Sequence, residues 1–221
     1  MMRLLRRSRD LGIGGFMARW YDKNTRQHRM AEMKAYAKEA AGHIRPGASV
    51  LEIAPGPGYL SIELAKLGNY IITGMDISRD FVEIARRNAK EAGVAVEFQQ
   101  GNVAEIPFAE NRFDFIICTA AFKNFKDPVK ALNEIYRVLR LKGTALIIDM
   151  NRNASNQQVQ ASINEMGLRG LARLNMSLTF RYFLRKGAYR KDDFAGLISN
   201  TPFKDYNIKE VGISLDVYLR K

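Results

Sequence analysis

Short apolar runs alternate with longer amphipathic stretches through the middle of the chain. The runs at 50–53, 70–76, 94–98, 113–119 and 144–149 are rich in Val, Ile and Phe, which predicts buried strands. Between them, apolar residues recur every three or four positions, which predicts helices. Strands and helices that alternate in this order predict an α/β, doubly wound fold, in which helices cover both faces of a mostly parallel sheet.

Segments at both ends of the chain extend this pattern. Residues 206–211 and 214–219 alternate apolar and polar side chains, which predicts a closing hairpin and hence a seven-stranded mixed sheet with one antiparallel strand near its edge. Ahead of the first strand, Asn24 and Thr25 predict the N-cap of a helix that runs to about Ala41. We expect one domain, 1–221, made of a helical lid (1–45), a core (46–150), a helical insertion after strand five (151–190) and a closing helix with the hairpin (191–221).

A glycine turn follows the first strand, within residues 50–60. Gly56 and Gly58 have no Cβ, so a ligand can lie against the bare backbone, and the next helix points its N-terminus at that ligand. Ser61 occupies the place of the third glycine of the dinucleotide fingerprint, and Glu52 stands inside the strand. Because an acid would repel a pyrophosphate, these residues predict a site for a ligand that carries positive charge.

A second acid, Asp76, ends the second strand. In doubly wound sheets an acid at this place can accept hydrogen bonds from both hydroxyls of a ribose. Asp76 could instead cap the next helix, but Ser78 is the better placed cap. We therefore interpret Asp76 as a ribose ligand.

The charge and the cysteine content narrow the choice of partners and compartment. With 35 Lys+Arg against 23 Asp+Glu, the net charge of +12 favours an anionic partner such as nucleic acid, an acidic lipid surface or an acidic substrate. The one cysteine, Cys118, lies in an apolar run, so we expect a core thiol in a reducing compartment. No apolar run is long enough to span a membrane and no secretory signal is evident, so we expect a cytoplasmic protein.

The first strand and its turn have the form acidic-apolar-x-x-Gly-x-Gly, and Phe113-Asp114 opens the fourth strand. In these motifs the chain resembles the class I S-adenosylmethionine-dependent methyltransferases, in particular the small-molecule enzymes of ubiquinone and menaquinone biosynthesis. The resemblance implies a Rossmann-like methyltransferase fold, S-adenosylmethionine as cofactor, S-adenosylhomocysteine as product, and no metal. The residues that it places at the cofactor are Tyr21, Glu52, Ala54, Gly56, Gly58, Asp76, Ile77, Asn102, Val103 and Thr119.

Several positions depart from the family pattern. Asn102 stands where relatives have an acid that accepts a hydrogen bond from the adenine amino group, and an amide oxygen can still accept that bond. Lys123 and Asn124 replace a histidine pair that many relatives carry after strand four, so we expect no general base from this loop. Leu141 and Lys142 replace a Pro-Gly pair and loosen the turn before strand five.

The lid and the insertion are the expected covers of the site. Tyr21 either reaches the methionine end of the cofactor, where it is the one candidate for a catalytic role, or anchors its helix. The insertion mixes long apolar side chains with arginines, so it packs in the core, lines an acceptor pocket, dimerises or lies on a lipid surface. Four arginines among the first nine residues indicate either a solvated terminus or a membrane or phosphate contact.

These observations predict an enzyme that transfers a methyl group from S-adenosylmethionine to a small or lipid-like acceptor, both apolar and anionic. Positioning of the acceptor and a dry cavity would supply most of the rate. An RNA methyltransferase fits the charge, but no RNA-binding domain is recognisable, so nucleic acid is the less favoured partner. A regulator that binds the cofactor without turnover fits the absence of an evident base. Peripheral membrane contact stays open, and the pattern does not define an oligomeric state.

Overall fold

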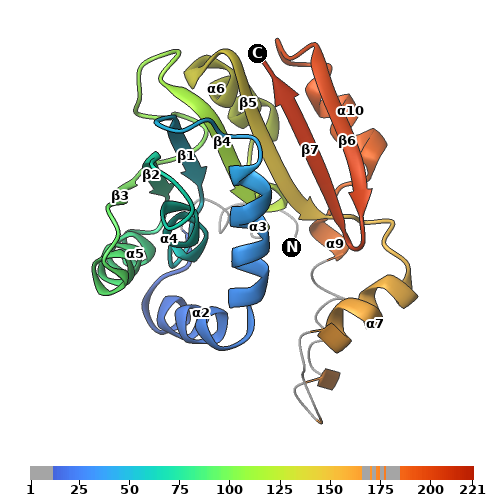
Figure 1. Cartoon of the computed structure of the whole chain (residues 1–221). Coiled ribbons are helices and arrows are strands. Elements are labelled where there is room, and N and C mark those ends of the chain that lie inside the picture. Colours follow the sequence, from blue (N-terminus) through green and yellow to red (C-terminus); the bar gives the residue numbers. More distant parts are fainter. Residues whose placement is uncertain (1–11, 166–169, 171–172, 175–176, 178–184) are drawn as a thin grey trace.

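The computed structural model describes residues 12–165, 170, 173–174, 177 and 185–221. Its centre is a seven-stranded sheet with the order β3-β2-β1-β4-β5-β7-β6 (Figure 1). β1 to β5 pair in parallel, whereas β7 is antiparallel to both β5 and β6. The predicted mixed sheet, with its antiparallel strand next to the edge, is therefore confirmed. The strands are β1 (Ser49–Ile53), β2 (Ile71–Asp76), β3 (Glu97–Gln100), β4 (Phe113–Thr119), β5 (Leu139–Met150), β6 (Asp205–Val211) and β7 (Ser214–Arg220).

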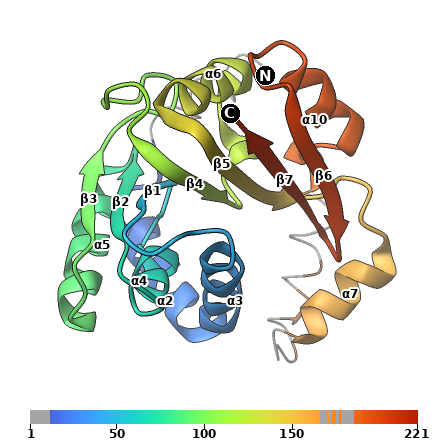
Figure 2. The same cartoon turned by 45° about the horizontal axis from the view of Figure 1, so that its top comes forward.

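Helices cover both faces of the sheet (Figure 2). One face packs against α3, α4 and α5, and the other against α6 and α10. Val50 packs on the face covered by α3, α4 and α5, and its neighbour Leu51 packs on the face covered by α6 and α10. This is expected for side chains that alternate along a strand buried on both sides. The helices are α2 (Gly15–His28), α3 (Met30–Ala41), α4 (Tyr59–Ala65), α5 (Arg79–Ala92), α6 (Pro128–Val138), α7 (Asn156–Glu165), α9 (Arg185–Gly187), α10 (Lys191–Ile198) and the 3-10 helix η2 (Phe122–Asn124).

Several local predictions are confirmed. The Ser78 Oγ accepts a hydrogen bond from the Phe81 amide and caps α5, and the Asp127 carboxylate caps α6 by accepting from the Lys130 amide. Cys118 is buried inside β4. Burial raises the pKa of its thiol well above the ordinary value, so the side chain is a neutral part of the core.

The lid differs from its prediction. Asn24 and Thr25 lie within α2 instead of capping a helix, and the chain turns at Arg29, between α2 and α3. The prediction was wrong because Asp22 and Thr25 are buried against the core, so polar residues in this helix mark its inner face. Hydrogen bonds from the Arg29 amide to the Thr25 carbonyl and from the Met33 amide to the Arg29 carbonyl continue through the turn.

The predicted turn ahead of strand five is part of the strand. β5 begins at Leu139, and Lys142 adopts a left-handed φ of 65° where the register with β4 shifts. This segment is held by the end of the chain, because the Lys142 amide donates to the Lys221 carbonyl at 2.8 Å. Strand three is shorter than predicted and begins at Glu97.

Part of the predicted lid and insertion lies outside the described residues. This applies to the four N-terminal arginines and to most apolar residues of the insertion. Leu174, which is described, is exposed. In the part of the chain that the structure describes, no helix combines the length and the apolar character that a membrane span requires. The residues named in these predictions that lie outside the described part of the chain are Arg3, Arg6, Arg7, Arg9, Met166, Leu168, Arg169, Leu171, Met176, Leu178, Phe180, Arg181, Tyr182, Phe183 and Leu184.

Candidate cofactor site at the carboxyl ends of the strands

The site begins where β1 and β4 end side by side. Their connections run to opposite sides of the sheet, which is the place where open α/β sheets bind ligands. The residue after each strand is a non-glycine in the left-handed region, Ala54 with φ 56° and Ala120 with φ 54°. Such backbone strain is uncommon and concentrates at functional sites.

The two glycines of the turn have different roles. Both have a positive φ, 54° at Gly56 and 82° at Gly58. A Cβ on Gly58 would lie 2.7 Å from the Cζ of Phe98, inside the core, whereas a Cβ on Gly56 would contact only the Tyr21 ring, at 3.8 Å. Gly58 is therefore needed for packing of the fold, and Gly56 leaves bare backbone toward the cavity beneath the lid.

Glu52 is almost completely buried, with 2% of its surface exposed. Its carboxylate accepts hydrogen bonds from the amide of Ser61, at 3.0 Å, and from the Ser61 hydroxyl. Ser61, at the third fingerprint position, thus holds the acid in place from the first turn of α4. Burial raises the pKa of Glu52 to about 7, so the group can change charge near neutral pH.

Asp76 joins the end of β2 to the glycine turn. Its Oδ2 accepts from the Gly56 amide at 3.0 Å, and its Oδ1 accepts from the Ser78 amide at 2.8 Å. Burial raises the pKa of this carboxyl group, and the backbone bonds oppose that effect. Each carboxylate oxygen keeps a further lone pair, so Asp76 can still accept from the hydroxyls of a ligand.

Three other residues predicted to bind the cofactor lie beyond β2 and β3. Ile77 and Val103 are half-buried and Asn102 is exposed. The Oδ1 of Asn102 accepts from the Ala104 amide at 2.9 Å, so one of its two lone pairs serves the loop itself. The predicted contact of Asn102 with adenine would use the other lone pair.

The lid covers a small cavity of about 40 Å³ over the glycine turn. Tyr21 and Thr25 of α2, Arg29 at the turn and Met33 of α3 line it from the lid. The spacing of four residues places Tyr21 and Thr25 on one face of α2. The predicted Tyr21 is thus at the site, with its ring edge-on to Phe81. The sequence reasoning missed the other three, although their spacing from Tyr21 was a usable signal. From the core the cavity is lined by Glu52, Ala54, Pro55, Gly56, Pro57, Tyr59, Thr119 and Ala120.

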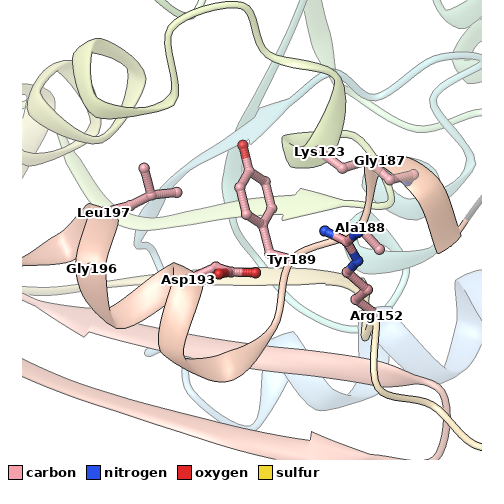
Figure 3. Close-up of a pocket in the computed structure, with 8 residues that line it drawn as sticks. All are labelled: Lys123, Arg152, Gly187, Ala188, Tyr189, Asp193, Gly196 and Leu197. Carbon is pink, nitrogen blue, oxygen red and sulfur yellow. The ribbon is translucent and has the colours of Figure 1, made fainter.

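A second cavity, of about 440 Å³, lies beside η2 and α10 (Figure 3). Figure 3 shows the Tyr189 ring near its middle, with Leu197 and Asp193 of α10 on one side and Lys123 and Arg152 on the other. Its volume is in the range of about 300–1,000 Å³ that small-molecule sites occupy.

A buried ion pair is bonded to residues that line the two cavities. The Nζ of Lys123 donates to Asp149 Oδ1 at 2.8 Å and to the Ala120 carbonyl at 2.7 Å. Ala120 lines the first cavity and Lys123 the second. The Lys123 ammonium is thus held between a buried carboxylate and a backbone carbonyl.

The fold, the buried acids and the glycine turn are similar to those of class I S-adenosylmethionine-dependent methyltransferases. Residues 51–147 match the family described as methyltransferase domain. The ubiquinone/menaquinone biosynthesis C-methyltransferase of Bdellovibrio bacteriovorus is 35% identical over 109 residues, which cover 49% of this chain and 46% of the relative. An uncharacterized methyltransferase of Bacillus subtilis is 28% identical over 169 residues, 65% of this chain and 66% of the relative. The chain spans about half the length of most curated relatives it matches.

Solved structures agree with the fold. A candidate S-adenosyl-L-methionine-dependent methyltransferase of Methanococcus maripaludis has a TM-score of 0.76 at 23% identity, over 92% of this chain and 91% of that chain. The plantazolicin methyltransferase, solved with a substrate analogue and S-adenosylhomocysteine, has a TM-score of 0.70 at 14% identity, over 99% of this chain and 96% of that chain. These likenesses confirm the predicted fold. The predicted class is supported by the family match and the curated relatives.

Proposed function

We propose that the chain transfers the methyl group of S-adenosylmethionine to a small or lipid-like acceptor that is apolar and anionic. The assignment of this cofactor is supported by the arrangement of Glu52, Gly56 and Asp76, in which two buried acids flank bare backbone. Asp76 would accept from the ribose hydroxyls, and Glu52 would face the cationic amino-acid end. The cofactor supplies a methyl group on a sulfonium, so the chain has to bind, orient and exclude water.

The larger cavity supports the acceptor half of the proposal. The Tyr189 ring packs against Phe122 and Phe194 and, with Leu197, offers an apolar wall to a ring or an acyl body. Arg152 lines the same cavity, and among the described residues its guanidinium has no hydrogen-bond or ion-pair partner. It would meet a carboxylate or phosphate of the acceptor.

The experiment is a transfer assay with cofactor that carries a labelled methyl group. It offers quinone precursors, aromatic acids, phospholipids and bulk RNA at low and high salt, with Asp76→Ala as the variant that should lose labelling. We expect label in an acceptor that has both an apolar body and an anionic group, and a lower rate with Arg152→Gln. Label in RNA alone, lost as salt rises, would favour an RNA methyltransferase instead. Bound cofactor without label in any acceptor would favour a regulator.

The buried Glu52 makes cofactor binding depend on pH. Its pKa of about 7 means that the apo protein holds a neutral acid at pH 6 and a carboxylate at pH 8. The ammonium group of the ligand prefers the carboxylate, so we expect affinity for S-adenosylhomocysteine to rise about ten-fold from pH 6 to pH 8, with proton release on binding near pH 7. Titration calorimetry in two buffers of different ionisation enthalpy measures both effects.

Glu52→Gln is the matched control, because an amide keeps an acceptor for Ser61 and does not titrate. The variant should bind more weakly at pH 8 and show no change between pH 6 and pH 8. It should also be more stable than the wild type at pH 8. The contribution of Glu52 to stability is fully present below its unfolded pKa and is lost as the pH rises through about 7. An equal pH response in both proteins would exclude Glu52 as the titrating group.

A further inference from the structure

A buried hydroxyl in the lid has no hydrogen-bond partner among the residues that the structure describes. The side chain of Thr25 is on the inner face of α2, with 2% of its surface exposed, and its Oγ1 makes no hydrogen bond within the described residues. Buried polar groups in folded proteins are nearly always paired, so an exception needs an explanation. Thr25 lines the small cavity over the glycine turn, where a ligand can supply the missing bond.

A cation lies one helical turn further along the same face. The Arg29 guanidinium donates to the Tyr21 hydroxyl at 2.7 Å, and through Nε and Nη2 to the two carboxylate oxygens of Glu32 at 2.8 and 3.2 Å. Burial alone would lower the pKa of Arg29, but Tyr21 and Glu32 outweigh it and raise the value, so the group stays charged. A guanidinium has five N–H groups, and these bonds use three of them.

The opposite wall of the cavity carries the other sign of charge. Glu52 lines it from β1, so one small space has an acid on the core side and a fixed cation with an unpaired hydroxyl on the lid side. An amino acid in its ionised form has the complementary pair of charges, an ammonium and a carboxylate. Among the parts of the proposed cofactor, only its amino-acid end matches this arrangement.

We infer that Arg29 and Thr25 bind the carboxylate of the amino-acid end of the cofactor, and that this contact selects S-adenosylmethionine and S-adenosylhomocysteine over adenosine compounds without that end. The inference rests on the proposed function. Arg29 stands at the turn where α2 meets α3, and its backbone is bonded to Thr25 in α2 and to Met33 in α3. A carboxylate held at this turn therefore fixes both lid helices over the site.

The test compares two ligands by titration calorimetry on the full chain. S-adenosylhomocysteine carries the amino-acid end, and 5′-methylthioadenosine lacks it. We expect Arg29→Gln to lower the affinity for S-adenosylhomocysteine by about 30-fold, because a charge-assisted pair of hydrogen bonds is lost. The affinity for 5′-methylthioadenosine should stay within about three-fold of the wild-type value. Thr25→Val keeps the shape of the side chain and should lower the affinity for S-adenosylhomocysteine by about five-fold. The melting temperature of the apo protein should not fall, because the hydroxyl has no hydrogen bond to lose among the described residues.

Lys23→Gln is the matched control, because it removes a positive charge from an exposed position of the same helix. It should bind both ligands as the wild type does. Wild-type affinity for S-adenosylhomocysteine in Arg29→Gln would overturn the inference, and so would an equal loss for both ligands, which would mean that the lid is disturbed as a whole. A wild type that binds neither ligand would overturn the proposed function itself, which distinguishes the two failures.

Discussion

Gly58→Ala should lower the free energy of unfolding by about 3 kcal/mol, because it combines backbone strain with a clash in the core. Gly58 has φ 82°, and its Cβ would lie 2.7 Å from Phe98 and 2.9 Å from Ala85. These neighbours join β3 and α5 to the glycine turn, so neither can move without disturbing the core. Urea unfolding of the apo protein measures the loss.

Gly93→Ala separates strain from clash. Gly93 has a similar φ of 68° at the end of α5, but a Cβ there would meet nothing within 4 Å. We expect a loss of about 1 kcal/mol, the cost of a left-handed alanine alone. If the two variants were equally stable, the packing argument for Gly58 would be wrong.

Lys123→Met should destabilise the protein by about 3–5 kcal/mol, because it leaves the Asp149 charge buried without its partner. Lys123 has 9% and Asp149 2% of the side chain exposed, and the carboxylate also accepts from the amides of Lys123 and Met150. With 2% of its side chain exposed, Asp149 has little access to solvent that could replace the lost cation. Thermal and urea unfolding at pH 8 measure the effect.

Two comparisons isolate the ion pair. Lys130→Met removes a lysine from the exposed side of α6 and should change stability by less than about 0.5 kcal/mol. Asp149→Asn removes the charge that Lys123→Met would leave unpaired. The double variant should therefore lose less free energy of unfolding than the sum of the losses in the two single variants. Additive losses would show that the two side chains do not interact.

The buried strands and the acids at or near their carboxyl ends could be predicted because their signals are local. A strand covered on both faces needs a continuous apolar run, and 113–119 has one, so β4 was placed without error. The places of Glu52 and Asp76 could be predicted in the same way, because each belongs to a local motif at the carboxyl end of a predicted strand.

The remaining site residues depend on tertiary contacts. Thr25 resembles a helix cap in sequence, and only the packing of α2 on the core turns it inward. The larger cavity joins Lys123, Arg152 and Tyr189 from three separate segments, which no local pattern connects. The start of β5 was missed because Lys142 is held by Lys221, which follows the neighbouring strand β7 and is distant from Lys142 in the sequence.

The two edge strands of the sheet, β3 and β6, affect how the protein behaves at high concentration. An open sheet edge can recruit a strand from another molecule and start aggregation. β3 offers only four residues for such pairing, from Glu97 to Gln100. β6 is longer, but it carries Asp205, Lys209 and Glu210 on exposed positions, and a second strand laid beside it would have to bring its own side chains among these charges. Both edges thus resist polymerisation through the sheet.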